Sequence, residues 1–216
     1  MVSATGEAIG QPGTFDLCGG HPVLDFVNSL DNRFNSSRGA VEGLRSYESL
    51  LRFTGEAGLL DPAQIAQVAR TAVTGEAVRA LRAARTLRET LAAIFYAMVA
   101  GQPPPTAELA ALERYFLTAD RHRELRWRHN AGEQSGLVWS WRQEEKGDAE
   151  LPVWALALAA RDLLLSPGVG RVRACEAETC RWLFLDNSKS HTRRWCKMKV
   201  CGNRVKARRY QARHAD

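Results

Sequence analysis

Two pairs of cysteines near the C-terminus constrain this chain of 216 residues more than any other feature of its sequence. Their order is Cys175-x4-Cys180-x15-Cys196-x4-Cys201. A Zn²⁺ ion takes four thiolate or imidazole ligands in a tetrahedron, and two close pairs separated by a loop supply them at a small entropic cost. The spacing therefore predicts a site for one zinc ion per chain, with these four cysteines as its ligands.

Three other uses of the cysteines compete with zinc. Buried structural thiols would not be expected to pair so regularly. Disulfides belong to oxidising compartments, whereas the N-terminal stretch has neither the positive nor the apolar region of a secretory signal. An iron–sulfur cluster also takes four cysteines, but usually with tighter x2 spacing. Zinc is the favoured interpretation; Cys18, distant in the sequence, and His191 are left out of the site.

The charge of the chain is divided unevenly. Residues 171–216 contain 13 Lys and Arg and 4 Asp and Glu, a net charge of +9. The whole chain carries +6, which leaves −3 for residues 1–170. This asymmetry is typical of a sensing or scaffolding domain joined to one that binds polyanions. A solvated basic tail that aids solubility would explain the same numbers.

Hydrophobic periodicity predicts a mainly helical body. Helices are expected to begin at Pro22, Ser46 and Asp61–Pro62, and to cover residues 75–100, 106–119 and 153–165. The helix over 75–100 has one broad apolar face that includes Val78 and Leu87. Between residues 124 and 143 the period changes to two, which predicts a β-hairpin with a loop at 131–136. The expected fold class is mainly α with a small β-hairpin, followed by a treble-clef-like zinc module with four cysteine ligands.

Composition divides the chain into three segments. Residues 1–14 are small and polar and are expected to be a disordered tail. Residues 15–168 would form the helical domain, and residues 169–216 the zinc module. The boundary falls in the cluster Ser166–Gly170, where the charge also changes sign. No apolar run approaches 18 residues, so we expect no membrane span and a cytoplasmic protein.

The zinc module resembles the CGNR zinc finger, named for the stretch that here is Cys201–Gly202–Asn203–Arg204. The preceding stretch fits the same pattern with Phe184, Asp186, Ser188, Arg194, Trp195 and Cys196. The stretch from His21 to Arg33, HPVLDFVNSLDNR, resembles the opening of the ABATE domain, which commonly precedes this finger. The resemblance implies a stress-linked bacterial transcription regulator with four cysteine zinc ligands.

The segment that follows Cys201 is predicted to form a basic helix. Gly202 would relieve crowding where the chain leaves the metal, and Asn203 would cap the helix by accepting backbone N–H bonds. Arginine suits phosphate oxygens and guanine edges, whereas a solvated C-terminal helix is the alternative. The candidate nucleic-acid-binding residues are Arg193, Arg194, Arg204, Lys206, Arg208, Arg209 and Arg213.

The N-terminal domain shows no Gly-rich phosphate loop, no G-x-S-x-G elbow and no paired histidines at helical spacing, so we expect no enzyme. Three tryptophans share one face of the predicted hairpin. They would line a pocket for a small-molecule effector, although such a face more often belongs to the hydrophobic core. The candidate pocket residues are Asn28, Arg33, Trp127, Trp139 and Trp141.

These features favour a zinc-dependent transcription regulator whose C-terminal module binds DNA and whose helical domain senses or scaffolds. A basic zinc module selects a polyanion but not its sugar, so RNA is the first alternative partner. A zinc-stapled protein-interaction adaptor is the second alternative, and an enzyme with an unrecognised site is the least favoured.

Overall fold

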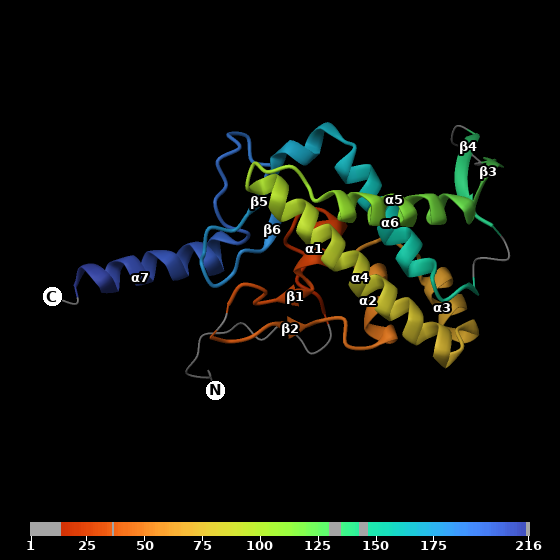
Figure 1. Ribbon diagram of the computed structural model, residues 1–216, viewed down its shortest axis with the longest axis horizontal. Coiled ribbons are helices and arrows are strands. Elements are labelled where there is room, and N and C mark those ends of the chain that lie inside the picture. The colour runs from red at the N-terminus through yellow and green to blue at the C-terminus, as the bar shows by residue number, and fades with distance from the viewer. Residues whose placement is uncertain (1–13, 36, 130–134, 143–146, 215–216) are drawn as a thin grey trace.

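The computed structural model describes residues 14–35, 37–129, 135–142 and 147–214 (Figure 1). Its elements confirm a mainly α fold with small two-stranded sheets. In chain order they are α1 (Pro22–Asn28), β1 (Leu30–Asp31), β2 (Val41–Glu42), α2 (Tyr47–Glu56), α3 (Pro62–Thr71), α4 (Thr74–Val99), α5 (Thr106–Arg121), β3 (Arg123–Arg128), β4 (Gly136–Trp141), α6 (Leu151–Leu164), η2 (Pro167–Arg171), β5 (Val172–Ala174), β6 (Leu183–Leu185), η3 (Met198–Gly202) and α7 (Asn203–Arg213).

Local capping signals set where the first helices begin. Pro22 occupies the first turn of α1, where its missing N–H needs no partner. The side chain of Ser46 accepts a hydrogen bond from the backbone of Ser49 at the start of α2, and Ser49 returns one. Asp61 does the same with Gln64 at the start of α3. Each predicted helix start is therefore confirmed, because each depends only on residues within one turn.

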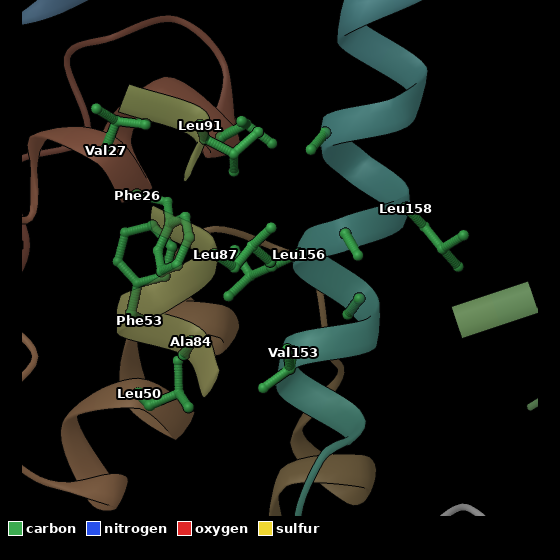
Figure 2. Packing of buried hydrophobic residues seen from close by; sticks show 14 of the residues in the cluster. Phe26, Val27, Leu50, Phe53, Ala84, Leu87, Leu91, Val153, Leu156 and Leu158 are labelled. Atoms are coloured by element: carbon green, nitrogen blue, oxygen red, sulfur yellow. The ribbon is translucent and has the colours of Figure 1, made fainter. Parts of the chain in front are cut away.

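The main hydrophobic core lies between α1, α2, α4 and α6. Figure 2 shows Phe26 of α1, Phe53 of α2 and Leu87 of α4 facing Leu156 of α6, and none of these four side chains is exposed. The alanines of α6 allow a close approach of its neighbours; Ala157 and Ala160 are fully buried. Helix α5 covers both α4 and α6, and the Asp120 carboxylate at its end pairs with Arg161 of α6 at 2.7 Å.

One detail of the predicted helices is wrong. Val78 is 52% exposed although it belongs to the apolar face predicted for α4. The buried residues of α4 begin only at Ala80, because the first turns of this long helix extend past the elements that cover its middle. Periodicity identifies a face but not how far along the helix that face is covered.

The predicted hairpin forms, but its tryptophan face is not core. Strands β3 and β4 are antiparallel, with Leu125 opposite Trp139 and Trp127 opposite Leu137. All four of these side chains are more than half exposed. Trp141, at the base, does pack against the core, with its ring centroid 6.1 Å from that of Trp154. Residues 131–134 of the predicted loop, like residues 1–13 of the predicted tail, lie outside the described residues.

The C-terminal segment shares the core of the helical body. Val172 of β5 and Leu183 and Leu185 of β6 are buried in the same cluster as α1 and α6. The side chain of Asn28 donates to the carbonyl of Leu183 and accepts from its N–H, both at 2.8 Å. The division at residue 168 stays a prediction, but the two segments that it separates share one buried hydrophobic cluster.

In the part of the chain that the structure describes, no helix has the combination of length and apolar character needed to cross a membrane.

Replacing Leu156 by Ala should lower the free energy of unfolding by about 2–5 kcal/mol, because a fully buried leucine leaves a cavity at the centre of the core. Urea denaturation followed by circular dichroism measures this loss. The matched control is Leu165→Ala, just past the end of α6, where the side chain is 78% exposed and the loss should stay within about 0.5 kcal/mol. Equal losses in both variants would contradict the packing described here.

Candidate metal centre and nucleic-acid interface

The four paired cysteines come together at one point. Their sulfur atoms all lie within 4.8 Å of one another, and Cys196 Sγ is 3.6 Å from both Cys180 Sγ and Cys201 Sγ. A Zn–S bond of about 2.3 Å places tetrahedral sulfur ligands about 3.8 Å apart. Cys175, Cys196 and Cys201 are buried and Cys180 is half-buried. The four cysteines therefore fit one zinc ion.

Two short structures hold the two cysteine pairs. Cys175 directly follows β5, and its N–H donates to the carbonyl of Trp182, so that the chain turns back through Cys180 into β6. Arg181 completes this turn with a φ of 61°. Cys201 lies in the π-helical turn η3, and its N–H donates to the carbonyl of Lys197. A turn on a β-hairpin thus supplies the first pair, and the loop before η3 together with η3 itself supplies the second, as in a treble-clef-like module.

The cluster of sulfurs changes the acidity of its members. Hydrogen bonds from Cys180, Cys196 and Cys201 hold the pKa of the Cys175 thiol below its usual range. Hydrogen bonding with Cys175 and the other neighbours raises the pKa of Cys196. Four thiolates cannot share so small a volume unless a cation stands between them, which is what Zn²⁺ supplies.

Cys18, which the sequence analysis left out of the ligand set because it is distant in the sequence, lies next to this centre in space. Its side chain packs against the cysteine cluster and lines a cavity of about 200 Å³ together with Cys180, Cys196 and Cys201. The segment before α1 crosses the module: Asp16 pairs with Lys197 at 2.6 Å, and the carbonyl of Gly19 accepts from the N–H of Leu185. No local sequence signal reports such a contact across the fold. His191, also left out of the predicted site, contacts the carbonyl of Asp186 instead.

Two of the predicted nucleic-acid contacts are engaged inside the module. The guanidinium of Arg193 donates to the carbonyls of Trp195 and Cys196 and lies 4.5 Å from the ring centre of Phe184. Arg194 pairs with Glu176 and lies over the ring of Trp195. Arg193 thus fastens the loop that carries Cys196, and the phosphate-binding role of both arginines stays a prediction.

The remaining candidates lie on α7, which projects from one end of the molecule (Figure 1). Among its described side chains only Val205 is half-buried, and the others, including Tyr210, are exposed. The cations Arg204, Lys206, Arg208 and Arg209 form no ion pair with a carboxylate among the described residues. The side chain of Arg213 lies outside the described part of the chain.

The start of α7 confirms one expectation and corrects another. A Cβ atom on Gly202 would lie 2.5 Å from Met198 Sδ, so the predicted crowding at the end of the metal-binding turn is confirmed. Asn203 does not cap the helix, and its side-chain amide instead donates to the carbonyl of Lys199 at 3.1 Å. The reason is that α7 continues directly from η3, whose carbonyls already accept the N–H groups that a cap would satisfy.

The five residues predicted to line an effector pocket do not meet. Trp127 and Trp139 are exposed on the hairpin at the end of the molecule opposite α7, and Trp141 packs at its base (Figure 1). Asn28 is buried against β6, and Arg33 pairs with Glu89 of α4. A cavity of about 520 Å³ does open beside Asn28, but the other residues that shape it, Asp25 and Trp182 among them, were missed. The available signal was the acidic Asp25 inside the apolar spacing of α1.

Purified protein should hold about one zinc ion per chain, because four thiolates complete its coordination. Cys196→Ser should lose the metal, since this sulfur contacts two others of the set. Cys18→Ser should keep it and is a close control, because that thiol lies beside the centre but outside the set of four. Elemental analysis together with the protein concentration gives the number of zinc ions per chain. An equal zinc content in the two variants would refute the assignment.

Comparison with known proteins gives two matches along the chain. Residues 20–167 match the family model described as "ABATE: Putative stress-induced transcription regulator", and residues 171–214 match the model of the CGNR zinc finger. No curated protein matches the chain. Both resemblances noted in the sequence are confirmed, and the four clustered cysteines lie within the second match. The chain belongs to the ABATE family and ends in a CGNR zinc finger.

Proposed function

We propose that this protein is a bacterial, cytoplasmic, stress-linked transcription regulator whose zinc-anchored helix α7 binds DNA. This proposal rests on one observation about α7. The helix starts at the metal centre, and cations without an ion pair are exposed around most of its described surface. The matching families support regulation and zinc binding, and neither is described as an enzyme.

The solvent exposure of α7 needs an explanation, because a helix that is polar on all sides gains little stability from packing. An isolated helix shorter than about 12 residues is marginal in water. In this chain η3 and Cys201 fix the first turn, and the cations beyond it repel one another until a polyanion is present. Phosphates would neutralise these cations and release counterions, which is the main source of affinity in DNA binding.

In this mechanism zinc would hold the start of α7 in place. When bound, the ion would fix the positions of Cys196 and Cys201, and Gly202 then leads without a break into α7. Arg193 keeps the loop before Cys196 in place through its bonds to the carbonyls of Trp195 and Cys196. The chain's own residues therefore set the direction in which the helix leaves the centre, while Arg204, Lys206, Arg208 and Arg209 make the contacts.

A second candidate function, a protein-interaction adaptor, is favoured by the β3–β4 hairpin. Leu125, Trp127, Leu137 and Trp139 form an exposed apolar face, and such faces mark interaction sites in soluble proteins. An adaptor would use this face and leave α7 a solvated helix. RNA binding is the alternative for α7 itself, since its cations would attract either nucleic acid.

The double variant Arg208→Gln, Arg209→Gln should flatten the dependence of DNA affinity on salt. Each lost phosphate contact removes about 0.9 from the slope of log affinity against log salt concentration, so a loss of about 1.8 is expected. Fluorescence anisotropy with a labelled DNA duplex over a salt series measures the slope, and a matched RNA duplex in parallel separates DNA from RNA.

The control is Arg79→Gln, Arg82→Gln on α4, which removes the same charge from exposed positions of the helical domain. Its slope should stay close to that of the unmodified protein, and both variants should keep their zinc. Equal slopes in both double variants, with zinc bound, would leave the adaptor as the better account.

A further inference from the structure

The cavity of about 520 Å³ lies where the helical domain meets the zinc finger. Its wall comes from α1, from the β1–β2 pair, from the start of α2 and from Trp182 of the finger. Cavities of about 300–1,000 Å³ are typical of sites for small organic ligands. The volume is far larger than a single metal ion requires, so an organic occupant fits it better.

Three residues of the wall also bind the finger at or next to strand β6, one of them through Gly19. The N–H of Gly19 donates to Asp25 Oδ1 at 2.6 Å, and the carbonyl of Gly19 accepts from the N–H of Leu185 at 2.7 Å. Asn28, one turn further along α1, exchanges two hydrogen bonds with the backbone of Leu183. Asp31 accepts a hydrogen bond from Trp182 Nε1 at 2.7 Å. A ligand that contacts this wall therefore contacts residues whose hydrogen bonds attach the zinc finger to the helical domain.

The wall carries an excess of carboxylates. Its acidic residues are Asp16, Asp25, Asp31, Glu42 and Glu48, against Arg45 and Arg52. Two of the carboxylates already have cationic partners, because Asp16 pairs with Lys197 and Glu42 with Arg88. Three carboxylates remain against two arginines, one of which pairs with Glu56 outside the wall, so the wall keeps a small excess of negative charge although the chain as a whole carries +6.

Asp25 is a buried carboxylate of this wall with one oxygen that lacks a hydrogen-bond partner among the described residues. Its side chain lines the cavity although the residue is only 6% exposed. The described part of the chain supplies a hydrogen bond to Oδ1 but none to Oδ2, and no ion pair to the carboxylate. Burial raises the pKa of Asp25 to about 7. A buried carboxylate in this state is stabilised by a cation or a charged donor placed against it.

We propose that this cavity binds a small organic cation, an amine or guanidinium compound, with its charged group at Asp25. Such a ligand would keep Asp25 ionised, and an ionised carboxylate is the stronger acceptor for the N–H of Gly19. The Gly19 peptide passes this effect to Leu185, so occupancy tightens the attachment of β6 to the helical domain. Neither the site nor its effect on β6 rests on the proposed function of α7.

The first experiment uses three probes of matched length on the zinc-loaded full chain: 1,4-diaminobutane, butane-1,4-diol and succinate. Isothermal titration calorimetry should show saturable binding of one diamine per chain, with the diol about tenfold weaker and no binding of succinate. No saturable diamine binding, or equal binding of the three probes, would overturn the proposal. Displacement of the diamine by Mg²⁺ at matched ionic strength would also overturn it, because the site would then be a metal site.

The second experiment removes the charge at the site. Asp25→Asn, which keeps the shape of the side chain, should weaken diamine binding about tenfold. The control Glu113→Gln removes one charge from an exposed position of α5 and should leave the affinity unchanged. If Asp25→Asn does not fold, Glu48→Gln at the exposed rim should still weaken binding about twofold to threefold. Unchanged affinity in a folded Asp25→Asn protein would refute the assignment.

Hydrogen exchange tests the link to the finger without any nucleic acid. The diamine should slow exchange in peptides that contain Leu183 and Leu185, and should have no such effect in Asp25→Asn. Diamine binding without this protection would refute the coupling. Because neither readout involves DNA, failure of the DNA-binding proposal would not be mistaken for failure of this one.

Discussion

The approach of four sulfur atoms to within 4.8 Å of one another is the contact on which the C-terminal part of this protein depends. The module around it has strands of three residues and a single π-helical turn. Its own buried cluster contains only Ala177 and Phe184 besides three of the cysteines, among the residues that the structure describes. So small an apolar cluster gives this end of the module little stability of its own; strands β5 and β6 gain stability from the main core, and we expect metal binding to supply much of the rest around the cysteines. The metal centre sets the position of helix α7, because this helix starts at the second residue after Cys201.

The zinc finger is also built into the helical domain rather than tied to it by a linker. Asn28, a buried polar residue of α1, completes the hydrogen bonding of Leu183 in β6, and Tyr96 of α4 donates to the carbonyl of Arg181. Removing one partner of such a buried pair leaves an unsatisfied group, which costs about 1–3 kcal/mol. These hydrogen bonds connect α1 directly to β6, so a displacement of α1 would also displace β6.

Much of the fold could be predicted because its signals are local. Ser46 and Asp61 marked helix starts within one turn, and the cysteine spacing identified the ligands of the metal centre. What failed depended on contacts between distant segments. Period-two alternation placed Trp127 and Trp139 on one face of a hairpin, but nothing local states whether another element covers that face. Cys18 reaches the metal centre only because the segment before α1 crosses the finger, and strands of two residues such as β1 are too short to show a period.

In the proposed mechanism, zinc fixes the start of α7 and DNA covers the rest of this helix. Hydrogen exchange of the peptide over residues 203–213, in zinc-loaded protein with and without a DNA duplex, tests it most directly. We expect rapid exchange beyond the first turn in the free protein and strong protection when DNA is added. Protection confined to the β3–β4 hairpin, with α7 still exchanging rapidly in the presence of DNA, would contradict it.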